Sequence, residues 1–294
     1  MSFVQFLISG ISLGSVYALI ALGYTMVYGI AKMLNFAHGD VIMVGGFTTY
    51  TICSTMGLHP VIGVLLAVVV CTSLGVLIER IAYKPLRKAS SPLAVLITAI
   101  GVSYLLQNLA LLIFGADSKA FSSVIAMEDL SLADGQLIIT GETIVTIVCC
   151  LIIMIGLMFF INKTKAGQAM LAVSEDKGAA QLMGINVNGT IALTFAIGSA
   201  LAAVAGILLC STYPSLTPYT GSMPGIKAFV AAVFGGIGSI PGALIGGILL
   251  GVIEILSKAY ISSQLSDAIV FAVLIIVLLV KPTGLLGKNI QEKV

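Results

Sequence analysis

Long stretches without a charged side chain are the feature that most limits how this chain can fold. Residues 1–31 contain no Asp, Glu, Lys or Arg. Comparable uncharged runs follow at 61–78, 89–116, 143–162, 192–226 and 228–253. A helix needs about 20 mostly apolar residues to cross the hydrocarbon core of a bilayer, so most of these runs are long enough. The sequence therefore predicts an all-α polytopic integral membrane protein.

The composition excludes several other classes of protein. Of the 294 residues, 59% are hydrophobic and 9% are charged, whereas soluble chains carry roughly 25% charged residues. The basic residues are too few and too scattered to bind nucleic acid. All five cysteines lie in apolar segments, where we expect buried small side chains rather than disulfides or metal ligands. The two histidines, His38 and His59, fall on opposite sides of a predicted span, so no metal site is predicted.

The uncharged runs predict about 8–10 spans in a single transmembrane domain, 1–294. Seven candidate spans are continuous: 5–30, 39–57, 60–79, 92–114, 142–161, 189–212 and 266–280. The remaining region, 225–257, is interrupted by Gly235, Gly236, Gly238 and Gly242. Such broken or re-entrant helices are tolerated where the irregular backbone is buried in protein or lines a cavity.

Lysine and arginine in short connections predict the orientation, because they favour the cytoplasmic side. They gather after the third span, on the segment 162–188 and after the last span. The loop 115–141 holds Asp117, Glu128, Asp129 and Asp134 against a single lysine, Lys119, and is predicted to lie outside the cell. If the first piece of the broken region crosses the membrane, the C-terminus is cytoplasmic. If that piece is re-entrant, the C-terminus lies outside. The positive charges after the last span favour crossing.

The cytoplasmic segment 162–188 has the pattern of a capped helix outside the bilayer. Ser174 is a suitable N-cap, with Glu175 and Asp176 in the first turn, and Gly184 suits a left-handed C-cap. One apolar face is formed by Ala179, Leu182 and Met183. We expect this helix to bind a partner protein.

Five polar residues in or near spans are candidates for a path or gate: Asn35, His38, Gln107, Asn108 and Glu254. Asn35 and His38 belong to a polar turn, in which His38 could pair with Asp40. Gln107 and Asn108 suit hydrogen bonds between helices. Intramembrane carboxylates are usually functional, but Glu254 could also sit at the interface and pair with Lys258.

The chain has no motif that would supply energy for transport. It contains no G-x-x-x-x-G-K followed by Ser or Thr, the phosphate-binding loop of many ATPases. No row of Asp and Glu runs through the spans, as proton-coupled transport would need. We therefore expect no enzyme activity of its own and a separate ATP-hydrolysing partner.

Four runs of the sequence resemble the permease subunits of branched-chain amino-acid ABC importers, of the LivH-like type. These runs are GSVYALIALGYTMVYGI with NFAHGDVIMVGGF, IGVSYLLQNLALLIFG, TKAGQAMLAVSEDKGAAQLMGIN and KAFVAAVFGGIGSIPGALIGGILLGVIE. The resemblance extends from Gly14 to Gly284, and it is the combination of motifs that makes it specific.

The resemblance implies a multi-pass subunit of a bacterial inner-membrane importer for leucine, isoleucine and valine. Its partners would be a second related permease, two cytoplasmic ATP-binding subunits and an extracytoplasmic substrate-binding protein. The coupling element would run from Lys165 to Ile185, where the residues that match the family pattern are Gly167, Glu175, Asp176, Ala179 and Gly184. No cofactor is implied, since the partners bind ATP.

Three other readings remain open from the sequence. A related importer could carry urea or short-chain amides. A stand-alone ion-coupled secondary transporter would need paired broken helices in both halves, and the first half shows no obvious partner for the segment near 235–242. A structural subunit or receptor that moves nothing is the third.

Overall fold

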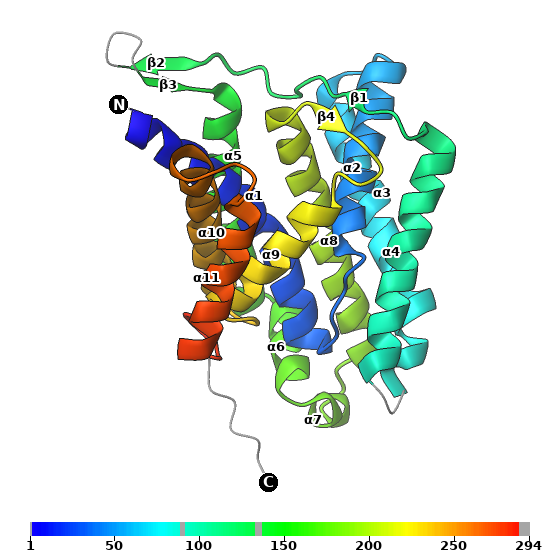
Figure 1. Ribbon diagram of the computed structural model, residues 1–294. Helices are drawn as coiled ribbons and strands as arrows, with labels where there is room; N and C mark the ends of the chain where they lie inside the picture. Colours follow the sequence, from blue (N-terminus) through cyan, green and yellow to red (C-terminus); the bar gives the residue numbers. More distant parts are fainter. Residues whose placement is uncertain (1, 89–91, 133–136, 288–294) are drawn as a thin grey trace.

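The computed structural model describes residues 2–88, 92–132 and 137–287, and these residues form a helical bundle (Figure 1). Its long helices are α1 (Ser2–Ala31), α3 (Pro60–Ile78), α4 (Pro92–Phe114), α5 (Gly141–Lys163), α8 (Val187–Thr212) and α10 (Ile240–Tyr260). Each of these is long and apolar enough to cross a membrane, counting the turn that extends α3 to Tyr83. The predicted all-α membrane fold is confirmed.

Shorter helices complete the bundle. They are α2 (His38–Tyr50), α6 (Lys165–Glu175), α7 (Lys177–Leu182), α9 (Ser222–Gly235) and α11 (Ser266–Val280). Two π-helical turns, η1 (Thr51–Thr55) and η2 (Glu79–Tyr83), extend α2 and α3, and a 3₁₀ turn, η3 (Pro85–Lys88), follows. In the described residues the strands are β1 (Lys119–Ala120), β2 (Leu130–Leu132), β3 (Leu137–Ile139) and β4 (Ser215–Leu216), paired antiparallel as β1–β4 and β2–β3.

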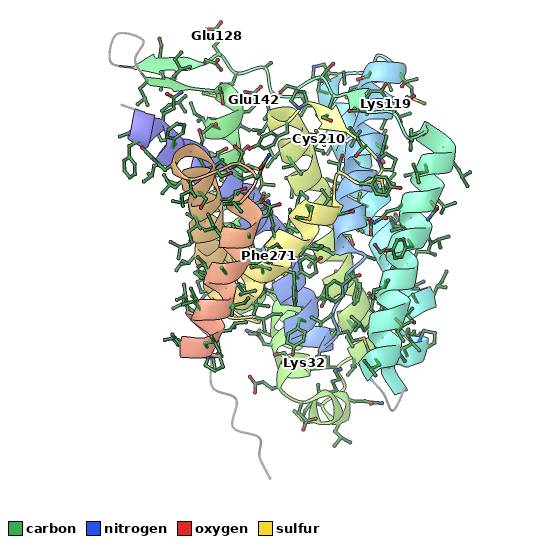
Figure 2. All side chains as sticks on the ribbon, viewed as in Figure 1. Lys32, Lys119, Glu128, Glu142, Cys210 and Phe271 are labelled. Atoms are coloured by element: carbon green, nitrogen blue, oxygen red, sulfur yellow. The ribbon has the colours of Figure 1, made fainter. Side chains whose placement is uncertain are left out.

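The two ends of the bundle differ in composition. The strands lie at one end, and α6, α7 and the last described residues lie at the other (Figure 1). Figure 2 places the acidic Glu128 and Glu142 at the strand end and Lys32 at the α7 end. Following the predicted orientation, we call these the outer and inner ends. The N-terminus lies at the outer end, while Asp134, Lys288 and Lys293 fall outside the described residues.

The glycine-interrupted region forms two helices, α9 and α10, joined by a turn. The chain leaves α8 at the outer end, α9 leads to the inner end, and α10 returns (Figure 1). Gly236 and Gly238 have positive φ angles of 105° and 94° in the turn between α9 and α10. Gly235 and Gly242 lie so close together across this turn that a side chain on Gly235 would meet the Gly242 carbonyl. These glycines therefore make a tight helical hairpin.

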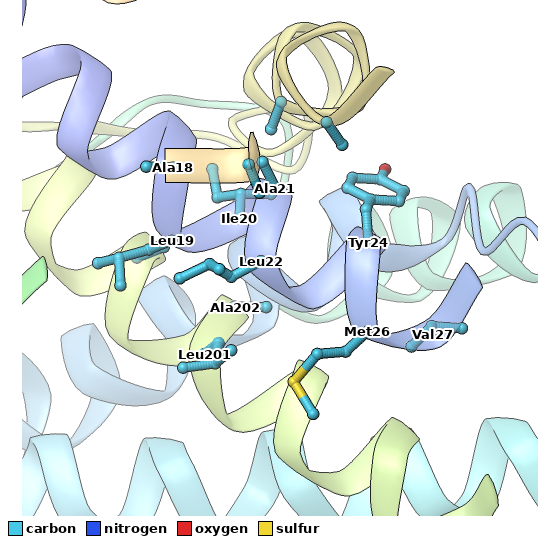
Figure 3. Packing of buried hydrophobic residues seen from close by; sticks show 14 of the residues in the cluster. Ala18, Leu19, Ile20, Ala21, Leu22, Tyr24, Met26, Val27, Leu201 and Ala202 are labelled. Carbon is cyan, nitrogen blue, oxygen red and sulfur yellow. The ribbon is translucent and has the colours of Figure 1, made fainter. Parts of the chain in front are cut away.

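Helix α1 is the centre of the core. Its apolar residues point in all directions, and a helix that is apolar all round is normally buried. Its side chains pack against α8, where Leu201 and Ala202 lie beside Leu19, Leu22 and Met26 (Figure 3). About 72% of the α1 span is buried, compared with 22% of the α4 span. Helix α1 is therefore the buried centre of the fold, and α4 is a peripheral helix that few protein side chains cover.

Small residues bring α1 and α10 into close contact. A Cβ on Gly14 would lie 2.6 Å from Ile248 Cα, and one on Gly10 would lie 2.8 Å from Val252 Cα. Real Cβ atoms do not approach so closely, so only glycine allows this packing.

Helix α2 is short and begins partway along the bundle (Figure 1). It follows residues 32–37, which are non-helical and partly buried. Its first residue, His38, is 1% exposed. The N-termini of α2 and α9 meet there, because a Cβ on Gly225 would lie 2.8 Å from Gly39 Cα. This junction lies at the start of α9 and not at the predicted break near 235–242. The polar turn predicted at Asn35 and His38 is buried inside the protein.

Candidate functional site

The inner-end segment contains two helices, α6 and α7, where one was predicted. Thr164 caps α6 by accepting a hydrogen bond from Gly167 N over 3.0 Å. Asp176 caps α7, and its Oδ1 accepts from Gly178 N at 2.7 Å and Ala179 N at 3.0 Å. The prediction that Ser174 is the N-cap was wrong. Ser174 lies in the last turn of α6, where its Oγ donates to the Leu171 carbonyl over 2.6 Å.

Two glycines fix the shape of this segment. Gly184 has a φ of +81°, and Ile185 N bonds to the Ala180 carbonyl over 3.0 Å, so the predicted C-cap is confirmed. A Cβ on Gly167 would collide with the backbone of Ile161 at the end of α5. Gly167 therefore allows α6 to fold back tightly against α5.

The predicted apolar face of α7 is bare. Leu182 is 90% exposed and Met183 is 82% exposed, and Ala179 is exposed beside them. We call Ala179, Leu182 and Met183 the coupling surface. Leu112 of α4 is as exposed, at 83%, but it lies on a membrane-spanning helix where lipid would cover it. Helix α7 lies at the inner end of the bundle (Figure 1), where large exposed apolar side chains favour burial against another protein.

The opposite side of α7 is attached to the bundle. Ala180 is buried, and Lys177 Nζ donates to the carbonyl of Ala31, the last residue of α1, over 2.9 Å. Burial, and then the positive charges of Arg87 and Lys32, lower the pKa of Lys177. Arg87 forms an ion pair with the buried Glu79 and donates to Asn188 Oδ1 over 2.5 Å.

The predicted path residues have different side-chain partners. Asn35 Oδ1 accepts a hydrogen bond from Tyr83 Oη over 2.9 Å. His38 packs edge-on against Tyr24, with ring centroids 4.7 Å apart. Within the described part of the chain, its Nε2 has no hydrogen-bond partner. The expected pairing of His38 with Asp40 is not observed.

Asp40 pairs instead with Gln107. The Gln107 amide donates to Asp40 Oδ1 over 2.9 Å and lies 3.3 Å from the hydroxyls of Ser103 and Ser222. This residue therefore links α4 to the starts of α2 and α9. Asn108 is exposed and donates to the Tyr104 carbonyl of its own helix over 2.8 Å. Neighbouring residues on a helix point about 100° apart, so one of the two faces inward and the other does not.

The chain was compared with known proteins. Residues 6–278 match the family described as branched-chain amino acid transport system, permease component. The chain belongs to this family. It is 46% identical to the high-affinity branched-chain amino acid transport system permease protein LivH of Salmonella typhimurium, with 99% of this chain and 98% of that protein covered. It is 45% identical to the corresponding permease protein BraD of Pseudomonas aeruginosa, with the same coverage.

A solved structure also matches the whole fold. PsaBC from Streptococcus pneumoniae in complex with Fab superimposes with a TM-score of 0.50 at 15% sequence identity, covering 96% of this chain and 93% of that chain. At this identity the match shows the fold alone. Together with the spans, these comparisons confirm the predicted family and membrane location of this permease.

Glu254 of the permease lies at the centre of a partly buried charge cluster, which we define as Tyr17, Lys227, Glu254, Lys258 and Asp267. Glu254 is 1% exposed and accepts hydrogen bonds from Lys227 at 2.8 Å, Lys258 at 2.6 Å and Tyr17 at 2.9 Å. Lys227 also pairs with Asp267 over 2.7 Å. The expected pairing with Lys258 is confirmed. The sequence analysis did not identify Lys227. A lone lysine near the start of an apolar helix could have indicated it.

Two cavities open among the described residues, and neither is lined by a predicted path residue. A cavity of about 350 Å³ at the outer end lies between α1, α5 and α8, with Ser12, Glu142 and Thr143 in its wall. One of about 340 Å³ lies between α2 and α4 and is almost entirely apolar. The path roles of Asn35, His38, Gln107, Asn108 and Glu254 stay predictions.

Proposed function

We propose that this permease is the transmembrane subunit of an ATP-binding-cassette importer for leucine, isoleucine and valine. The observation that carries the proposal is identity of 46% to a branched-chain amino acid permease over nearly the full length of both chains. Identity that runs through all the spans, rather than through one motif, supports a shared path as well as a shared fold. The expected site is the inner membrane of a bacterial cell.

Energy would come from two ATP-binding subunits at the inner end. The coupling surface offers Leu182 and Met183 on a short capped helix, a form suited to a groove on a partner. Glu175 and Asp176 lie beside them and could contact polar groups at the rim of that groove. The permease itself would make no covalent bond with its substrate.

Two more partners complete the proposed importer. A second, related permease would pack beside this one. Helix α4 offers a surface for it, because only 22% of its span is buried within the chain and the rest is open to contact. A substrate-binding protein would dock at the outer end, where the loop 115–141 and the strands lie. ATP binding would bring the two motors together, move α7 as a rigid body and open the path outward.

The test is uptake by the reconstituted complex. We expect binding-protein-dependent accumulation of labelled leucine in vesicles that contain ATP, with competition by isoleucine and valine. Competition by urea or acetamide, but not by isoleucine, would move the assignment to an importer for amides. Uptake that proceeds without ATP hydrolysis would contradict the proposed function.

A further inference from the structure

We infer that Lys177 is a positioning residue that transmits movement of α7 to the connection between α1 and α2. This inference rests on the proposed function, because it explains how a motor bound to the coupling surface could act on the helices inside the membrane. The hydrogen bond from Lys177 Nζ to the Ala31 carbonyl, over 2.9 Å, joins the short cytoplasmic helix directly to the central helix.

The bond acts at the C-terminus of α1, where backbone acceptors are free. The last four carbonyls of a helix have no partner within it, and a cation is favoured there by the helix dipole. Ala31 is 1% exposed, so its carbonyl is held among packed side chains. Lys177 therefore bonds to a buried part of the core rather than to an exposed surface group.

The chain changes direction immediately after this point. Lys32 has a φ of +57°, the one positive φ angle of a non-glycine residue in the described chain. Lys32 N donates to the Tyr28 carbonyl over 2.9 Å, as in a left-handed helix C-cap, a position that favours glycine. A lysine is disfavoured in this region, and such positions are often found at switch regions.

The segment after Lys32 leads into the middle of the bundle. Residues 33–37 form no helix or strand, yet Asn35 is 3% exposed and Ala37 is fully buried. The bond from Tyr83 Oη to Asn35 Oδ1 fixes the segment against η2. Irregular buried backbone of this kind can change shape without breaking a ladder of hydrogen bonds.

The segment ends where the two short helices meet. Gly39 at the start of α2 touches the backbone of Gly221 and Gly225 at the start of α9, with no room for a side chain between them. A shift of the α1 terminus would therefore reach both short helices at once. The route runs from α7 through Lys177, Ala31 and residues 32–37 to this junction.

The experiment uses the complete reconstituted importer and measures labelled leucine taken up per ATP hydrolysed. Lys177→Met keeps the aliphatic stem and removes the ammonium group. We expect the ATP-binding subunits to co-purify and hydrolyse ATP, while uptake per ATP falls by at least about fivefold. Lys177→Arg, which can still donate to the Ala31 carbonyl, should recover most of the ratio. Lys84→Met, an equal change at another exposed inner-end lysine, should match the wild type.

A second variant tests the other half of the route. Lys32→Gly relieves the positive φ at no steric cost and should fold normally, yet it softens the connection and should also lower uptake per ATP. An unchanged ratio in Lys177→Met overturns the inference. If that variant does not assemble, an unchanged ratio in Lys32→Gly overturns it. A wild-type complex that contains no ATPase contradicts the proposed function instead, so the two failures are distinguishable.

Discussion

The bundle buries the centre of the charge cluster around Glu254 but leaves the coupling surface on α7 exposed. In the cluster each of Glu254 and Lys227 is nearly fully buried and has at least two partners. On α7 the charged Lys177 points inward to Ala31, while Leu182 and Met183 face outward without cover. Paired buried charge holds helices together within one chain. Exposed apolar surface at the aqueous inner end is available to bind a second chain.

The largest expected effect comes from breaking the cluster. Glu254→Gln removes the negative charge that Lys227 and Lys258 share and should lower the free energy of unfolding by about 3 kcal/mol. Asp267→Asn is the matched control: the side chain of Asp267 is 44% exposed, and the change should cost less than about 1 kcal/mol. Thermal unfolding in detergent, followed by far-UV circular dichroism, measures both. Equal losses would mean that the cluster is not the buried unit described here.

The next effect separates Gln107 from its neighbour Asn108. Gln107→Leu leaves the buried Asp40 without its amide donor and should cost roughly 1–3 kcal/mol. Asn108→Leu removes a bond to the same helix on an exposed face and should be close to neutral. The same unfolding measurement compares them. A larger loss of stability in Asn108→Leu would contradict the inward position of Gln107 on α4.

The smallest effect tests the caps of the inner-end helices. Asp176→Ala removes the acceptor for Gly178 N and Ala179 N and should weaken α7 by about 1 kcal/mol. Ser174→Ala should change little, because Ser174 lies within α6. Amide hydrogen exchange over residues 176–184 detects the difference. Faster exchange in Ser174→Ala but not in Asp176→Ala would contradict the cap at Asp176 and support the N-cap predicted at Ser174.

The sequence predicts the spans closely because uncharged length decides whether a helix can cross a bilayer. The predicted span 92–114 coincides with α4, and 142–161 lies inside α5. Gly184 was also predictable, since a left-handed C-cap favours glycine for a local reason.

Features that depend on tertiary packing were less predictable. Ser174 and Asp176 are both good caps, and the break in the backbone that selects Asp176 depends on how α6 packs against α5. The buried start of α2 carries the same polar residues as a surface turn would. The partners of Lys227 come from α10 and α11, and no spacing within the sequence relates them.

The measurement that tests the central claim most directly is purification of Leu182→Glu beside the wild type from the native membrane in mild detergent. Gln181→Glu serves as the control, because it adds the same charge to an exposed neighbour on α7 without removing apolar surface. The wild type and Gln181→Glu should retain two ATP-binding subunits and a second permease. Leu182→Glu should keep the second permease and lose the ATP-binding subunits, together with leucine uptake. Full retention of the ATP-binding subunits by Leu182→Glu, with normal uptake, would contradict the docking role of the coupling surface.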